Sequence, residues 1–139
     1  MEIKTFIGLP QEAKNIRETV FVKEQGFTDE YDEKDAVATH FVMFEDGKAI
    51  ATCRIFEKEE KGVYMFGRMA VLKQLRGKNL GRKMIEAAQN FVSEQGGKKI
   101  ILHAQLHAQG FYEKNGFSPY GEIESEQGCP HIWMEKELI

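Results

Sequence analysis

The chain has 139 residues, of which 42% are hydrophobic and 29% are charged, a composition that suits one globular domain over residues 1–139 with a substantial core. A formal net charge of −3 gives no broad attraction to nucleic acid, and no apolar run approaches the roughly 20 residues that cross a membrane. The first residues lack the basic-then-apolar build of a secretory signal, so we expect a cytoplasmic protein. Its two cysteines, Cys53 and Cys129, form no metal-type cluster, and we expect two reduced thiols, one in a strand and one in a loop.

The first part of the chain predicts a strand over 1–8, followed by a helix that begins near Pro10 and ends at Gly26. The acidic stretch 28–34 then predicts a surface loop. Its carboxylates either attract a cationic amine or form a solvated loop, the usual fate of a charge run.

Three strands are predicted next, over 39–45, 48–56 and 63–72. Asp46-Gly47 separates the first two and is the strongest hairpin signal in the chain. The third strand is apolar on both faces, as expected of a central, buried strand.

The remaining elements alternate between helix and strand. Apolar residues at helical spacing predict a helix over 79–95, which Gly96-Gly97 ends. A strand over 99–105 and a helix over 107–115 follow. The last two strands, 117–123 and 131–137, are expected to be joined by a polar loop. A helix between two buried strands implies one parallel pair in an otherwise antiparallel, mixed α/β sheet.

An anion site is predicted where the strand 63–72 runs through a glycine-bearing turn into the helix 79–95. The first N–H groups of a helix have no partner inside it, and the helix dipole places positive charge there. Arg76, Lys78, Arg82 and Lys83 add further positive charge. Neither GxxxxGK[ST] nor GxGxxG is present, so the turn is neither a Walker loop nor a dinucleotide fingerprint. The alternative interpretation is a plain helix start with solvated basic residues.

Three motifs together resemble the GCN5-related N-acetyltransferases, the GNAT superfamily, over nearly the whole chain. They are the R/Q-x-x-G-x-G/A signature at Arg76-Gly-Lys-Asn-Leu-Gly81, the cofactor strand at Arg68-Met-Ala-Val71 and the late motif Ala108-Gln-Gly-Phe-Tyr-Glu-Lys-Asn-Gly-Phe117. Finer likeness points to the ElaA-type branch, at Val20-Phe-Val-Lys-Glu-Gln25, His103-Ala-Gln105 and Gly128-Cys-Pro-His-Ile-Trp-Met134.

The resemblance implies the GNAT fold, with a mixed, mostly antiparallel sheet of six or seven strands that splays at the cofactor strands and is flanked by helices. It implies acetyl-CoA as co-substrate, with no metal. The residues expected to bind it are Met69, Ala70, Val71, Arg76, Gly77, Lys78, Asn79, Leu80, Gly81, Arg82 and Tyr112. Asn79 replaces the first glycine of the signature. Asparagine tolerates a positive φ better than most residues, but its side chain would narrow a close approach of the pyrophosphate.

The implied reaction is N-acetyl transfer to a primary amine of a small molecule or peptide, by direct attack on the thioester. Tyr112 stands where the family often keeps the acid that protonates the leaving thiolate. His103 is the leading candidate for the base, because it ends the strand that faces the proposed thioester. The residues by themselves leave the base open among Glu24, His40, His103, Glu126, His131 and a water relay. Tyr31, Phe27 and Trp133 are expected either to line an acceptor pocket or to belong to the core.

Two alternatives from other classes stay open: a catalytically inactive CoA-binding or sensor protein, and a module that binds another phosphate ligand. The partners expected are acetyl-CoA and an amine acceptor, with no nucleic acid and no membrane. The sequence leaves the oligomeric state open, and the resemblance adds a homodimer as one possibility, since the family often forms dimers.

Overall fold

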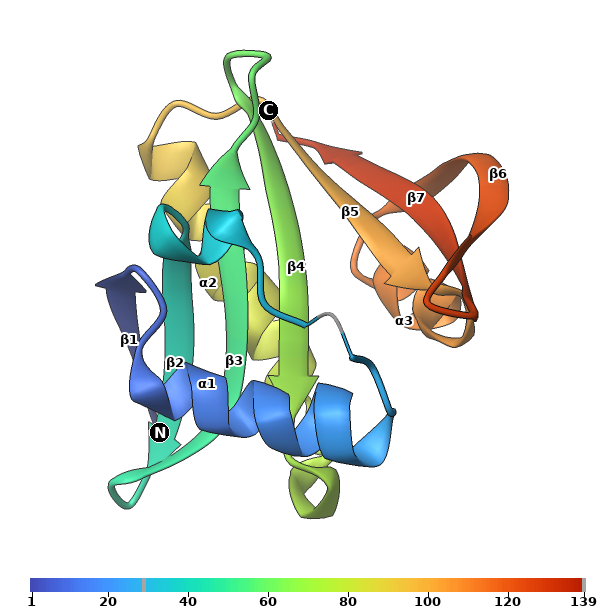
Figure 1. Cartoon of the computed structure of the whole chain (residues 1–139). Coiled ribbons are helices and arrows are strands. Elements are labelled where there is room, and N and C mark those ends of the chain that lie inside the picture. The colour runs from blue at the N-terminus through green and yellow to red at the C-terminus, as the bar shows by residue number, and fades with distance from the viewer. Residues whose placement is uncertain (29, 139) are drawn as a thin grey trace. The chain divides into compact units, whose positions relative to one another are not determined.

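The computed structural model describes residues 1–28 and 30–138, and Figure 1 shows their path. The strands are β1 (Glu2–Ile7), β2 (Thr39–Glu45), β3 (Lys48–Glu57), β4 (Val63–Val71), β5 (Lys99–Gln105), β6 (Ser118–Glu126) and β7 (Cys129–Glu137). The α-helices are α1 (Gln11–Arg17), α2 (Leu80–Glu94) and α3 (Gln109–Lys114). A π-helix, η1 (Glu18–Glu24), and three 3-10 turns, η2 (Glu33–Ala36), η3 (Lys73–Leu75) and η4 (Leu106–Ala108), complete the elements.

The predicted mixed sheet is confirmed: it has seven strands in the order β1-β2-β3-β4-β5-β7-β6. By its contacts the chain divides into two compact units, residues 1–56 with 66–88, and residues 57–65 with 89 onward. Both β4 and α2 contribute residues to each unit. A single domain over 1–139 stays a prediction, and the two units are described separately below.

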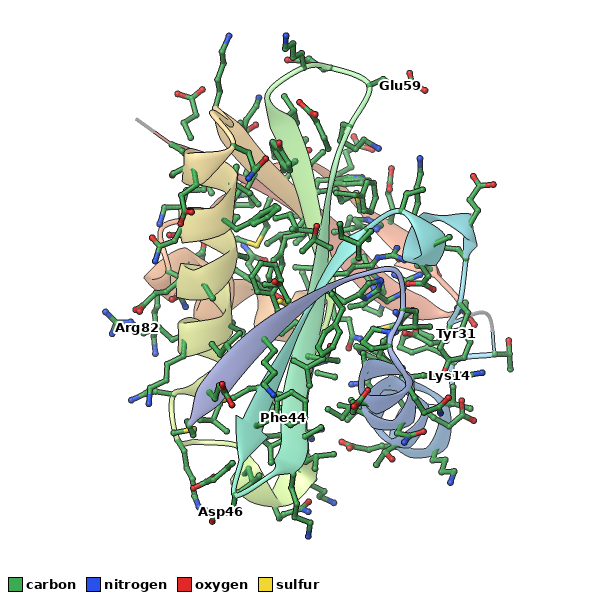
Figure 2. The ribbon with its side chains drawn as sticks, turned by 90° about the vertical axis from the view of Figure 1, so that its left-hand side faces the viewer. Lys14, Tyr31, Phe44, Asp46, Glu59 and Arg82 are labelled. Carbon is green, nitrogen blue, oxygen red and sulfur yellow. The ribbon has the colours of Figure 1, made fainter. Side chains whose placement is uncertain are left out.

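The first unit holds β1, β2 and β3 in antiparallel pairs, together with the later part of β4. The Asp46-Gly47 hairpin is confirmed, and both residues have positive φ, 51° and 77°. Figure 2 shows this part of the sheet between α1 on one side and the first turns of α2 on the other, with Asp46 at the tip of the β2–β3 hairpin. The predicted anion turn follows β4 and leads into α2.

The first helix is not the single α-helix that the sequence predicts. Pro10 stands just before α1 as expected, but from Glu18 the helix widens into the π-helix η1. Ile16, Val20 and Phe21 pack there against Ala70 of β4. Because π-helices are rare and cluster at functional sites, this contact with the predicted cofactor strand is notable.

In the second unit, Val63–Met65 of β4 pair in parallel with Lys99–Ile101 of β5. The parallel pair predicted around α2 is therefore confirmed, and it covers these three residues of each strand. On its other side β5 pairs antiparallel with β7 along its full length, and β7 pairs with β6.

The last hairpin departs from the prediction. β6 and β7 each extend inward, so the polar loop shrinks to Gln127-Gly128, and both of these residues have positive φ. Such a pair forms the tight turn that matches the twist of two strands. Cys129 is therefore the first residue of β7 rather than a loop residue, whereas Cys53 lies in β3 as expected. The helix predicted over 107–115 is the turn η4 followed by the shorter α3.

Candidate active site

The predicted anion turn lies between β4 and α2 and has the backbone of an anion-binding loop. After the short turn η3, Gly77 and Asn79 adopt left-handed conformations, with φ of 85° and 62°. Asparagine therefore serves at the position where the family pattern has glycine. At the start of α2 the Lys83 N–H donates to the Asn79 carbonyl, with 3.2 Å between nitrogen and oxygen. The N–H groups of the residues before Lys83, Leu80 to Arg82, thus lie where a helix end offers donors to an anion.

The basic side chains around this turn do not all face a ligand. Arg76 donates to both carboxylate oxygens of Glu24, at 2.6 and 2.9 Å, and its Nε donates to the Val71 carbonyl at 2.9 Å. Its guanidinium therefore joins the end of η1 to the end of β4. Arg82 pairs with Glu86 one turn along α2 and points into solvent, as Figure 2 shows.

Glu24 is consequently a poor general base. The hydrogen bonds from Arg76 lower the pKa of its carboxyl, which reduces its affinity for a proton. Of the base candidates, Glu24 is thus occupied as the partner of Arg76.

The predicted cofactor strand contains one residue with a left-handed backbone conformation. Arg68 in β4 has a φ of 51°, a conformation that is uncommon for a residue with a side chain. The next three residues differ in exposure: Ala70 is buried in the cluster with η1, while Met69 and Val71 are partly exposed. Strain of this kind persists only where surrounding contacts fix it. Here the Arg68 side chain supplies them, because its Nε donates to the Glu30 carbonyl at 3.1 Å.

The acidic segment expected to be a loop that is solvated or attracts an amine is instead paired internally. Asp29 lies outside the described residues. Arg17, which is 1% exposed, donates to Glu30 and to Asp35, each at 2.7 Å. Arg54 binds Asp32 at 2.7 Å and Asp35 at 2.9 Å.

The carboxylates of Glu30, Asp32 and Asp35 therefore face three guanidinium groups, those of Arg17, Arg54 and Arg68, whereas Glu33 is exposed. Their charges cancel. We call this largely buried network of ion pairs the buried ionic tether of the first unit. Its paired carboxylates are not free to attract an amine.

His40 is another base candidate that the structure removes. It is 1% exposed, and its Nε2 lies 3.0 Å from the Asp35 carbonyl oxygen. Since a carbonyl only accepts, Nε2 carries a proton. Burial lowers the pKa of this imidazole, which keeps it neutral, but the ring is enclosed and its task is structural.

Two of the three expected acceptor aromatics have defined roles in the first unit. Tyr31 donates to Glu18 at 2.9 Å and lies beside Lys14, as the labels in Figure 2 show. Burial, followed by that hydrogen bond, raises the pKa of its phenol to about 12. Phe27 packs against the apolar cluster of η1 and β4. The packing of Phe27 favours the core interpretation, whereas Tyr31 is half-buried and held by polar partners.

The other three base candidates gather in the second unit. His103 of β5 and His131 of β7 have ring centroids 4.9 Å apart, and Glu126 of β6 reaches both. Its Oε2 lies 3.2 Å from His103 Nδ1 and 3.4 Å from His131 Nε2. Trp133, the third expected acceptor aromatic, stacks on the His103 ring at 4.4 Å. The structure thus assembles one imidazole–carboxylate cluster from residues that the sequence presents separately.

Glu124 belongs to the same cluster and is absent from the residues that the sequence singles out. Its Oε1 lies 3.4 Å from His103 Nε2. Glu124 and Glu126 are two apart on a strand, so they share a face, and the register pairs Glu124 with His131. Recognising the Gln127-Gly128 turn would have revealed this pairing.

Tyr112 lies in α3 and is 8% exposed. Its ring meets Phe111 and Phe117 edge-on, with centroids 5.1 and 5.9 Å away. The body of the side chain is thus fixed by packing, which suits either a core residue or an acid held in one place. Its role as the acid stays a prediction.

Two expectations concern absences. In residues 1–28 and 30–138, three or more histidine, cysteine or acidic side chains nowhere converge on a metal-binding geometry. Over the same residues, no helix has the length and apolar character needed to cross a membrane.

Comparisons with known proteins identify the family. Residues 9–138 match the model of the acetyltransferase (GNAT) domain. A Bacillus subtilis protein named only provisionally as an acetyltransferase is 35% identical over 90% of this chain and 87% of its own. The Escherichia coli protein ElaA is 30% identical over 89% of this chain and 84% of its own. The ElaA crystal structure covers 98% of this chain and 99% of its own, with a TM-score of 0.87 at 27% identity.

The chain therefore belongs to the GNAT acetyltransferase family, as the motifs predict, and its fold is the GNAT fold. It is an acetyl-CoA-dependent N-acetyltransferase, with acetyl-CoA as the co-substrate that supplies the acetyl group. The likeness to ElaA, in sequence and in structure, also confirms the finer resemblance.

Proposed function

We propose that this enzyme acetylates a primary amine of a small molecule or peptide by direct attack on the thioester, with His103 as base and Tyr112 as acid. The amine nitrogen attacks the acetyl carbonyl, and the carbon–sulfur bond breaks. The amine's proton passes to His103 Nε2, and the leaving thiolate takes the proton of the Tyr112 hydroxyl. No covalent intermediate on the enzyme is needed.

One observation carries the choice of His103. Its Nδ1 lies at hydrogen-bond distance from Glu126, while its Nε2 is buried and makes no hydrogen bond within the described residues. An imidazole whose first nitrogen donates to a carboxylate presents its second nitrogen as a lone pair. Nε2 therefore has no hydrogen bond to give up when it takes the proton of the amine, and the Glu124 carboxylate at 3.4 Å would face that proton.

For the co-substrate, the proposal keeps all the residues predicted from the motifs. The pyrophosphate would be held by the main-chain N–H groups of the turn from Gly77 to Arg82, and the pantetheine arm would lie along Met69, Ala70 and Val71. The left-handed Gly77 and Asn79 support the first part, because loops whose main-chain amides bind an anion commonly contain residues in this conformation. Arg76 would contribute its backbone rather than its side chain, which Glu24 occupies.

The proposal is tested by CoA release from acetyl-CoA with a panel of monoamines, polyamines and peptides. His103→Gln should lower kcat by about 100-fold or more, the usual worth of a positioned base. His107→Gln is the matched control, since His107 is exposed and its Nε2 meets Gln105 at 2.6 Å. Equal activity in the two variants would exclude His103 as the base.

Two further variants test the acid and the anion turn. Tyr112→Phe should lower kcat while leaving the Kd for acetyl-CoA nearly intact, and an unchanged kcat would remove Tyr112 from the acid role. Gly81→Glu should abolish CoA binding, because it places a carboxylate at the helix start. Tight CoA binding without any amine-dependent release would instead favour the sensor interpretation. A homodimer in the cytoplasm stays a prediction, and light scattering checks the dimer.

A further inference from the structure

We infer that Glu126 is a positioning residue, which sets the tautomer of His103 so that Nε2 rather than Nδ1 is the basic nitrogen. The inference rests on the proposed function, in which His103 is the base. It assigns to the exposed strand β6 a part in the reaction that the family motifs do not.

The first step is the direction of the hydrogen bond. An ionised carboxylate only accepts, so the 3.2 Å contact between Glu126 Oε2 and His103 Nδ1 places the proton on Nδ1. Trp133 stacks on the ring at an interplanar angle of 21° and fixes its plane. The tryptophan thus sets how the ring lies, and the glutamate sets which nitrogen keeps a lone pair.

The second step is how Glu126 is itself held, since its side chain is 49% exposed. His131 is 7% exposed, and its Nδ1 donates to the Cys129 carbonyl at 2.9 Å. Its Nε2 lies 3.4 Å from the same Oε2 that meets His103. Because Nδ1 is the donor to Cys129, Nε2 attracts this carboxylate only when the ring carries a second proton; in either state the buried ring limits the space that Glu126 can occupy.

The third step separates the two glutamates. Glu124 faces the basic nitrogen itself, at 3.4 Å from Nε2, and so cannot direct a proton to Nδ1. Its charge favours a proton on Nε2, in the neutral ring as well as in the charged one, so Glu124 opposes Glu126, which is the closer of the two carboxylates, at 3.2 Å against 3.4 Å. The charged and titratable groups that face His103 are thus Glu124 and Glu126 of β6 and His131 of β7.

The test combines a tautomer measurement with kinetics. In ¹⁵N-labelled protein without ligand, NMR of the ring nitrogens should show His103 protonated at Nδ1 in the wild type. It should stay so in Glu126→Gln, whose amide oxygen still accepts, and change to an Nε2–H or mixed state in Glu126→Ala. With amine and acetyl-CoA, Glu126→Ala should lower kcat by about 10- to 100-fold, the scale known for partners that orient metal-bound histidines. Glu126→Gln should lose less, and KM for acetyl-CoA should not change.

Glu122→Gln is the matched control, an exposed glutamate of the same strand that should leave both readouts unchanged. The inference is overturned if His103 of the wild type is protonated at Nε2, or if its tautomer is the same in Glu126→Ala as in the wild type. A tautomer change with unaltered kcat in an active enzyme also overturns it. If the wild type acetylates no amine but the His103 tautomer still changes in Glu126→Ala, the proposed function is refuted and the role of Glu126 in setting the tautomer is supported.

Discussion

Replacing Arg17 by methionine tests whether the buried ionic tether stabilises the first unit. The substitution keeps a long apolar side chain in place of one that is 1% exposed, but removes the guanidinium. Glu30 and Asp35 are then left buried without the partner that binds each of them at 2.7 Å.

The expected cost follows from those contacts. Removing one member of a buried ion pair typically costs about 3–5 kcal/mol, because the other charge stays desolvated. Asp35 keeps Arg54 at 2.9 Å, and Glu30 keeps Arg68 at 3.4 Å. These remaining partners place the expected loss at the lower end, about 3 kcal/mol. That is a large share of the roughly 5–15 kcal/mol by which domains are stable.

The assay is urea unfolding of the ligand-free protein at pH 7, and the control is Arg82→Met. Arg82 also pairs with a glutamate, but its side chain is 67% exposed, so its loss should cost no more than about 0.5 kcal/mol. Adding Asp35→Asn to Arg17→Met should recover part of the loss, since it removes one stranded charge. If Arg17→Met proved as mild as Arg82→Met, the tether would be structurally neutral and the reasoning from burial would be wrong.

Three other substitutions test separate features. Asp35→Asn should make the free energy of unfolding depend less on pH in acid. Burial alone would raise the pKa of this carboxyl, but Arg17 and Arg54 lower it to about 2 from 3.8. The carboxylate therefore contributes about 2 kcal/mol of stability that is present above pH 4 and is lost as the pH falls toward 2. The slope of unfolding free energy against pH would show this, and an unchanged slope would refute it. Glu24→Gln should tighten CoA binding a few-fold at low salt, because the positive charge of Arg76 is then no longer neutralised. About 0.5 M NaCl should remove this difference, and titration calorimetry can measure both affinities. Asn79→Ala should cost about 1 kcal/mol because of its φ of 62°, and Asn79→Gly much less; equal losses would contradict the left-handed backbone.

Much of the fold could be predicted because its signals are local. Asp46-Gly47 marks a turn by itself, and the apolar spacing of α2 marks a helix by itself. The π-helix η1 could not be predicted, because its widening has no local sequence signal. The last hairpin was predicted with too long a loop, because Gln127-Gly128 lacks the asparagine or aspartate that usually announces a tight turn.

The candidate site was predictable to a similar extent. The glycine-bearing turn after β4 comes from a motif that is continuous in sequence, and His103 was singled out by its place near the end of a predicted strand. The tether does not, because Arg17 meets Glu30 and Asp35 across 13 and 18 residues, and Arg54 meets Asp32 across 22. A local charge pattern shows an acidic run but not the distant arginines that neutralise it.

The two thiols of the chain are placed very differently, with a practical result. Cys53 is 0% exposed in β3, and burial strongly raises the pKa of its thiol, so it should resist alkylation in the folded protein. Cys129 is partly exposed at the start of β7, next to the strand pair that carries Glu126 and His131. A maleimide dye added to the native enzyme should therefore attach at one position and report on the histidine cluster without any engineered cysteine.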